Sequence, residues 1–241
     1  MDSIEIENSK LVVKIKANEE DIRLVKIFEN INKDTSIKLK QFVSKKTLHK
    51  GDMLLYEQQE VSTVYFVIRG KVNIYKTTQS GQKKIIYLLS DGAMINEDVF
   101  GRGSSIVACE AFEEATILYL SKEKLLELMK EDFNLTQDVI LSMSKKMGRL
   151  YRQLKNSVAT RIDRKIAAKL LKLSKDYGKE IDKGILIDLN ITITYLSEML
   201  GHSRENISKA IKQLESQGLL CYKNKKIIID REKLLNFHKS M

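Results

Sequence analysis

The chain has 241 residues, enough for two modest domains, and its 42 basic and 32 acidic residues give a net charge of +10. Two distant cysteines, Cys109 and Cys221, supply neither a disulfide framework nor metal-ligand spacing. No apolar run approaches the roughly 20 residues of a membrane helix, and the N-terminus has no signal pattern. The sequence therefore predicts a cytoplasmic protein with no membrane partner.

The positive charge is concentrated in the C-terminal part of the chain. Residues 1–144 carry 20 basic and 22 acidic side chains, whereas residues 145–241 carry 22 basic and 10 acidic ones, a net +12. A basic half joined to a near-neutral half indicates a nucleic-acid-binding module attached to a domain of another kind. On charge alone, a lysine-rich surface that only keeps the protein soluble is the alternative.

The first elements are a short alternating stretch and a helix. Alternation of apolar and polar residues over 4–15 predicts a hairpin or an edge strand. Residues 18–21, Asn-Glu-Glu-Asp, are typical of a helix start. The apolar residues expected on one face of this helix are Ile22, Val25, Phe28 and Ile31.

Short β-rich runs dominate residues 42–120. The predicted strands are Met53–Tyr56, Thr63–Ile68, Val72–Thr77, Ile85–Leu89, Ile106–Cys109 and Thr116–Leu120. Glycines punctuate these runs at Gly51, Gly70, Gly81 and Gly92. Many short strands with turn residues between them predict an antiparallel barrel or roll.

Helices follow the β-rich region. Ser121 is the expected N-cap of one helix, and a longer helix begins at about Leu135. The longer helix has a coiled-coil seam of Val139, Met143, Met147, Leu150 and Leu154. Such a helix needs a partner, either a second copy of the chain or its own domain. Beyond it the pattern predicts a helix at Ile166–Leu173, a polar loop at 178–184 and a strand at Ile185–Leu189.

Residues 192–229 form one helix-turn-helix unit with a basic wing. Thr192 is a good N-cap for a short helix, Ser203 caps the second helix, and Gly218 ends it where a left-handed residue is needed. Two apolar strands, Leu219–Tyr222 and Lys226–Ile229, follow. This arrangement is typical of a winged DNA-binding module.

The first turns of the second helix carry side chains that can read double-stranded DNA in the major groove. Arg204 can donate two hydrogen bonds to guanine, and Glu205 can accept from the amino group of cytosine. The predicted base-reading residues are Arg204, Glu205, Ser208 and Lys209. The predicted contacts to the DNA backbone, which set register without reading sequence, are Thr192, Ser203, Lys223, Lys225 and Lys226.

The segment GHSRENISK at 201–209, followed by QGL at 217–219, resembles the recognition segment of Crp/Fnr-family transcription regulators. HKGD at 49–52 and VYFVIRGKV at 64–72 resemble the start of that family's cyclic-nucleotide-binding-type roll. The resemblance implies an α+β chain with an antiparallel β-roll sensor domain, a long dimerisation helix and a C-terminal winged helix-turn-helix domain. The expected divisions are an extension at 1–27, the roll at 28–131, the helix at 132–160 and the DNA-binding domain at 161–241.

The resemblance also implies a homodimer on a palindromic operator and a contact with RNA polymerase. It places Arg204, Glu205 and Lys209 where the cAMP receptor protein reads DNA, in half-sites like TGTGA or TTGA. Lys209 stands where the family usually has arginine, and lysine keeps the charge but lacks the guanidinium fork.

The sensor departs further from the family pattern, because the arginine that would hold a cyclic phosphate is replaced near Ser104 and Ser105. A buried phosphate without a cation is poorly compensated, which disfavours cAMP. The candidate effector-pocket residues are Glu97, Arg102, Ser104, Ser105, Leu150 and Tyr151.

An iron–sulfur cluster of this family needs four cysteines and is not expected. For haem, the candidate ligands in the roll are His49 and Cys109. Three hypotheses for control therefore stay open: an effector other than cAMP, a haem or gas sensor, and a regulator that needs no ligand. No enzyme is expected, because the sequence has no nucleophile–base set, Gly-rich phosphate loop or metal cluster.

Overall fold

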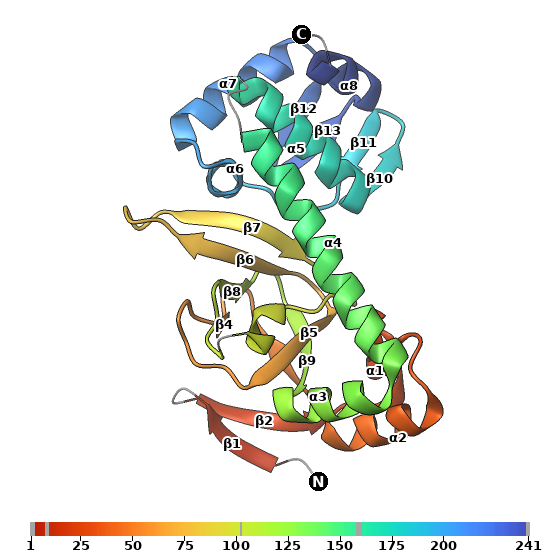
Figure 1. Cartoon of the computed structure of the whole chain (residues 1–241). Coiled ribbons are helices and arrows are strands. Elements are labelled where there is room, and N and C mark those ends of the chain that lie inside the picture. Colours follow the sequence, from red (N-terminus) through yellow and green to blue (C-terminus); the bar gives the residue numbers. More distant parts are fainter. Residues whose placement is uncertain (1–2, 8–9, 102, 158–160, 240–241) are drawn as a thin grey trace. The chain divides into compact units, whose positions relative to one another are not determined.

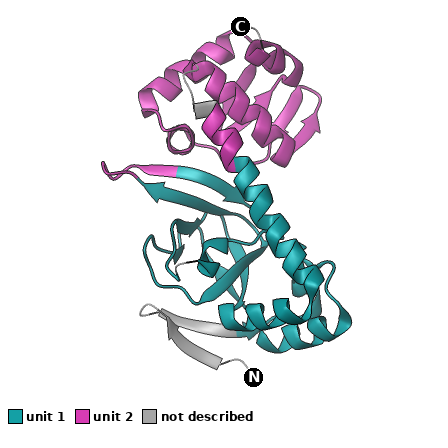
Figure 2. Ribbon diagram, viewed as in Figure 1, with its two compact units in different colours: residues 1–77, 85–149 teal, residues 78–84, 150–241 magenta. Residues whose placement is uncertain are grey.

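The computed structural model describes residues 3–7, 10–101, 103–157 and 161–239 of an α+β chain (Figure 1). The chain divides into two compact units (Figure 2): unit 1 comprises residues 1–77 and 85–149, and unit 2 comprises residues 78–84 and 150–241. Among the described residues, no helix combines the length and apolar character that crossing a bilayer requires.

Unit 1 is built on two sheets, which confirms the predicted roll of antiparallel strands. The strand order is β1-β2-β3-β9-β5 in one sheet and β4-β8-β6-β7 in the other. The strands are β1 (Ser3–Glu7), β2 (Lys10–Lys16), β3 (Ser44–Leu48), β4 (Met53–Leu55), β5 (Thr63–Arg69), β6 (Val72–Thr77), β7 (Lys83–Leu89), β8 (Ala108–Ala111) and β9 (Ala115–Ser121). Phe66, paired with Leu118 across β5 and β9, lies fully buried at the centre of the core.

The six predicted strands correspond to β4 to β9, and the structure differs from the prediction in two places. β8 begins at Ala108 because Ile106 is exposed and donates its backbone N–H to Asp98, 2.6 Å away, in a loop. β3 was missed because its sequence, SKKTL, contains too few apolar residues to mark a strand. The N-terminal alternation is a hairpin, β1 and β2, and β2 joins the sheet by pairing with β3.

The helices of unit 1 are α1 (Glu19–Arg23), η1 (Lys26–Phe28), α2 (Lys33–Phe42), η2 (Glu97–Phe100), α3 (Lys122–Glu131) and α4 (Phe133–Ser157), whose last residues belong to unit 2. The single helix predicted from residue 18 is wrong. The chain leaves the helical conformation at Val25, and the N–H of Lys26 bonds the carbonyl of Gly92, 3.1 Å away. Ser121 caps α3 as predicted, accepting from the N–H of Lys124 at 3.2 Å.

Unit 2 contains the helices α5 (Ile162–Tyr177), α6 (Ile193–Leu200), α7 (Arg204–Ser216) and α8 (Arg231–Lys239) and the sheet β10-β11-β13-β12. Its strands are β10 (Gly178–Ile181), β11 (Gly184–Ile187), β12 (Leu220–Lys223) and β13 (Lys226–Ile229). The predicted polar loop at 178–184 is instead the β10–β11 hairpin. A fully exposed strand such as β10 buries no apolar face, so periodicity does not reveal it.

Asp132, which is buried, fixes the start of α4. Its carboxylate accepts the backbone N–H groups of Asn32 at 2.8 Å, Asn134 at 3.0 Å and Leu135 at 3.4 Å. Burial alone would raise the pKa of this carboxyl, but the hydrogen bonds to the charged form outweigh it, so the pKa is lowered.

Replacing Asp132 with alanine should cost about 1–2 kcal/mol of unfolding free energy at neutral pH, the range for a lost helix N-cap. Because the folded-state pKa lies below the unfolded one, this stabilisation is complete above about pH 4 and disappears as the pH falls through the folded value. Urea unfolding of the wild type and Asp132→Ala should therefore give a stability difference that narrows in acid. A difference that stays constant with pH would contradict the role of the carboxylate charge.

Candidate nucleic-acid interface and roll site

The turn between α6 and α7 has the caps predicted from the sequence. The side-chain oxygen of Thr192 accepts the N–H of Tyr195 at 3.0 Å, and that of Ser203 accepts the N–H of Asn206 at 3.3 Å. Gly201 lies between the two helices in the left-handed conformation, with φ of 70°. A residue with a Cβ is disfavoured there, so this turn depends on glycine.

Helix α7 is held by one apolar stripe, formed by the buried residues Ile207, Ala210, Ile211 and Leu214. Burying a side chain such as isoleucine or leucine contributes roughly 1.5–3 kcal/mol, so the stripe fixes the rotation of the helix. At about 3.6 residues per turn, the opposite side carries Glu205, Lys209 and Lys212, with Arg204 and Ser208 beside them. Arg204, Glu205, Lys209 and Lys212 are exposed, and Ser208 is half-buried. We call Arg204, Glu205, Ser208 and Lys209 the reading face.

Lys212 was missed from the sequence. It lies three residues after Lys209, and α7 continues unbroken to Ser216. Its spacing of three residues from Lys209, which puts both on one side of a helix, was the signal that could have identified it. It lengthens the positive surface beside the reading face by one turn.

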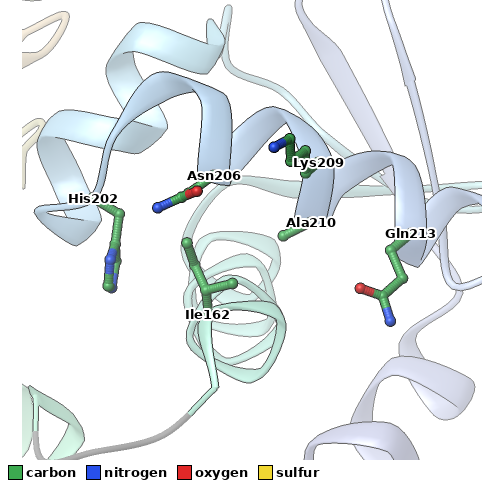
Figure 3. Close-up of a pocket in the computed structure, with 6 residues that line it drawn as sticks. All are labelled: Ile162, His202, Asn206, Lys209, Ala210 and Gln213. Atoms are coloured by element: carbon green, nitrogen blue, oxygen red, sulfur yellow. The ribbon is translucent and has the colours of Figure 1, made fainter.

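A shallow hollow of about 440 Å³ flanks the reading face (Figure 3). Its lining residues are Ile162, His202, Asn206, Lys209, Ala210 and Gln213. Figure 3 shows Ile162 of α5 directed toward α7, near Asn206. Burial, followed by the nearby Lys165 and Lys84, lowers the pKa of His202 and disfavours the charged imidazole. Lys209, which is exposed, is the lysine of this lining.

The wing is a tight hairpin that presents lysines at its turn. Lys223 and Lys226 are paired across β12 and β13, and the two turn residues, Asn224 and Lys225, have φ of 52° and 62°. Two consecutive left-handed residues are typical of the type I′ turns that match the twist of a hairpin. Lys223 and Lys225 are exposed, as phosphate contacts require.

Lys226 has a partner within the protein. Its ammonium lies 3.1 Å from a carboxylate oxygen of Asp188, which also binds Lys179 of β10 at 2.7 Å. Hydrogen bonds from these two lysines lower the pKa of Asp188. The positive charge of Lys226 is therefore partly compensated within the protein, which makes Lys226 a weaker candidate for a phosphate contact than Lys223 or Lys225.

Two of the predicted effector-pocket residues, Glu97 and Ser105, are buried in unit 1. Glu97 lies in η2 and is buried, with its carboxylate bound to Lys146 and accepting from the hydroxyl of Ser142 at 3.2 Å. Ser105 is also buried, and its hydroxyl donates to the carbonyl of Val107 at 2.7 Å. We call Glu97, Ser142 and Lys146, with the backbone they bind, the roll site.

The other predicted pocket residues are Ser104, Leu150, Tyr151 and Arg102. Ser104 lies in an isolated bridge with Glu60. Leu150 and Tyr151 are exposed on α4. Arg102 lies outside the described residues. Ser142 and Lys146 were missed from the sequence, where both read as ordinary polar positions of a long helix.

Helix α4 has two faces. Leu135 and Val139 are buried in the core of unit 1, so placing Val139 in the exposed seam was wrong. The exposed apolar row begins one residue later and consists of Ile140, Met143, Met147, Leu150 and Leu154, between 42% and 68% exposed. These five residues, spaced alternately by three and four, are called the seam below.

The two haem candidates differ sharply in their surroundings. His49 is exposed, with Nδ1 3.7 Å from a carboxylate oxygen of Glu114. Cys109 is fully buried, and burial raises the pKa of its thiol, which disfavours the thiolate that a metal would need. Within the described part of the chain, no group of three or more His, Cys, Asp or Glu side chains could hold a metal ion.

Comparison with known proteins agrees with this architecture. The family model described as Cyclic nucleotide-binding domain matches residues 45–132, and that described as Crp-like helix-turn-helix domain matches residues 164–237. A CRP-like cAMP-activated global transcriptional regulator of Mycobacterium tuberculosis is 19% identical over 210 residues, covering 86% of this chain and 94% of its own.

Solved structures show the same fold. A CooA variant from Carboxydothermus hydrogenoformans is 20% identical, with a TM-score of 0.71, covering 83% of this chain and 89% of its own. The c-di-GMP-responsive regulator CLP of Xanthomonas campestris is 18% identical, with a TM-score of 0.70, covering 82% of this chain and 99% of its own.

A roll of the cyclic-nucleotide-binding type joined to a helix-turn-helix domain defines a DNA-binding transcription regulator. The chain belongs to the Crp/Fnr family, as the recognition segment indicated.

Proposed function

We propose that this regulator acts in the cytoplasm as a homodimer, placing two copies of α7 in successive major grooves of a pseudo-palindromic operator. The observation that carries the proposal is the reading face, whose orientation is set by two N-caps and four buried apolar residues. A polar helix end that only faced water would not need this support. Contact with RNA polymerase, implied by the family, is part of the same proposal.

The seam supports the dimer. Five apolar side chains in a heptad pattern on a 25-residue helix lie exposed in a single chain. A second copy that packed the same five residues against them would bury both rows at once, which is the self-complementary contact of a twofold dimer.

Replacing Met147 and Leu154 together with lysine should convert the dimer into monomers in sedimentation velocity, because each interface would then contain four buried charges. Leu141→Lys is the matched control, since Leu141 is also exposed and apolar but lies on another side of α4. A dimer that survives the double substitution, or dissociates with the control, would place the interface elsewhere.

Arg204 and Lys225 should respond differently to substitution. Arg204→Ala should cost on the order of 1–3 kcal/mol per half-site on the operator and relax the preference at one base pair. Lys225→Gln should weaken all duplexes about equally and lower the dependence of log K on log salt by about one per subunit.

Competition binding of operator and scrambled duplexes at two salt concentrations measures both effects. In the operator, the centres of the half-sites should lie about 10 bp apart. If Arg204→Ala weakened operator and scrambled DNA by the same factor, Arg204 would contact phosphate, and base reading would belong to the rest of the reading face.

The roll site favours control by something other than cAMP. Glu97 already binds Lys146, and the hydroxyl of Ser105 donates to the backbone, so both of these predicted pocket side chains have partners within the protein. The names of the compared proteins, one cAMP-activated and one c-di-GMP-responsive, support the view that this fold does not determine its effector.

Millimolar cAMP should therefore leave the melting temperature and operator affinity of this protein unchanged. A ligand that binds the folded form must stabilise it by mass action, so differential scanning fluorimetry detects binding directly. The cAMP-activated regulator of M. tuberculosis is the positive control, and AMP is the ligand control. A saturable rise in melting temperature with cAMP but not AMP would refute the prediction.

A further inference from the structure

The ammonium of Lys146 has a full set of hydrogen-bond acceptors within unit 1. It donates to the carbonyl oxygens of Met94 at 2.8 Å and Ile95 at 3.1 Å and to the carboxylate of Glu97. An ammonium has three N–H donors, and all three have acceptors here. The side chain is only 17% exposed, and that of Glu97 only 10%. The ammonium is therefore bonded within the protein and little exposed to water.

The acceptors and the helix are held by further contacts. Ser142, one turn before Lys146, donates its hydroxyl to the other carboxylate oxygen of Glu97 at 3.2 Å. The hydroxyl of Tyr87 on β7 donates to the backbone carbonyl of Lys146 at 2.8 Å. Both charges of the pair are therefore compensated, and removing one partner would leave a buried charge alone, which is strongly destabilising.

The ion pair continues the contact between α4 and the roll beyond the apolar core. Leu135, Val139, Ser142 and Lys146 follow one another at steps of four, three and four residues on one side of α4. The first two are buried among apolar residues, and the last two bind Glu97. Met143 and Met147 of the seam immediately follow Ser142 and Lys146 in the chain. The roll site therefore fixes α4 where its seam is exposed.

We propose that Lys146 acts as a tethered ligand: its ammonium occupies the polar site of the roll and holds the seam-bearing part of α4 in the DNA-binding arrangement, so that no small-molecule effector is needed. This inference rests on the proposed function and selects the ligand-independent form of control. Because the ammonium is attached to α4, it is present at the site at a high effective concentration and competes well with free molecules.

Lys146→Ala tests the proposal, because the atoms it removes correspond to n-propylammonium, which can be supplied in solution. Lys145→Ala is the matched control, since it removes the same charge from the adjacent, exposed position of the same helix. Two readouts are measured on the full-length protein: operator affinity and melting temperature, each with n-propylammonium or with tetramethylammonium at equal ionic strength.

The wild type and Lys145→Ala should bind the operator without additive and be indifferent to both cations. Lys146→Ala should bind about tenfold or more weakly and melt at a lower temperature, and n-propylammonium alone should restore both values. The double variant Glu97→Gln/Lys146→Met, which leaves no buried charge, should fold and be indifferent to both cations.

An unchanged operator affinity of Lys146→Ala would overturn the inference, as would a melting temperature that n-propylammonium does not raise. A different outcome would contradict the proposed function: the wild type would bind no operator under any condition. Because the melting temperature is measured without DNA, recovery by n-propylammonium still tests the occupancy of the roll site in that case.

Discussion

The structure depends on one helix, α4, that carries two apolar stripes, one buried in the roll and one exposed. One side supplies Leu135 and Val139 to the core of unit 1, while the adjacent side exposes the seam. The two stripes differ by about a quarter of a turn, the separation of neighbours such as Val139 and Ile140. The rotation of α4 about its axis is therefore set by the roll, and with it the direction in which the seam points.

In the helix-turn-helix unit, short-range hydrogen bonds and one backbone conformation fix the orientation of α7. Two hydroxyl caps and a left-handed glycine fix the turn. Tyr222 ties the wing to the two helices, donating its N–H to Glu215 near the end of α7 at 2.8 Å and its hydroxyl to the carbonyl of Ile191 before α6 at 3.1 Å. The exposed residues of α7 take no part in these contacts. Their identity is free to serve recognition, because the stability of the unit comes from elsewhere.

The sequence was most informative where local patterns carry the structure. The caps at Ser121, Thr192 and Ser203 were predicted correctly because capping depends on residues within one turn. β3 and β10 were missed because both lie in sheets while burying little apolar surface. Val139 was assigned to the seam because a helical repeat in a sequence does not say which partner each stripe meets. The contacts of Lys146 are with three residues about 50 positions earlier in the chain, and no local sequence pattern predicts contacts of this kind.

Asp188 makes the positive charge of the DNA-binding unit uneven, because it compensates some of its lysines and not others. One carboxylate compensates Lys179 and Lys226 on β10 and β13, whereas Lys223 and Lys225 at the wing turn are exposed. The positive potential of this sheet is thereby weakened along the strands and concentrated at the tip. A duplex approaching this sheet would therefore meet the strongest positive potential at the tip, and the charge distribution would orient it before close contact.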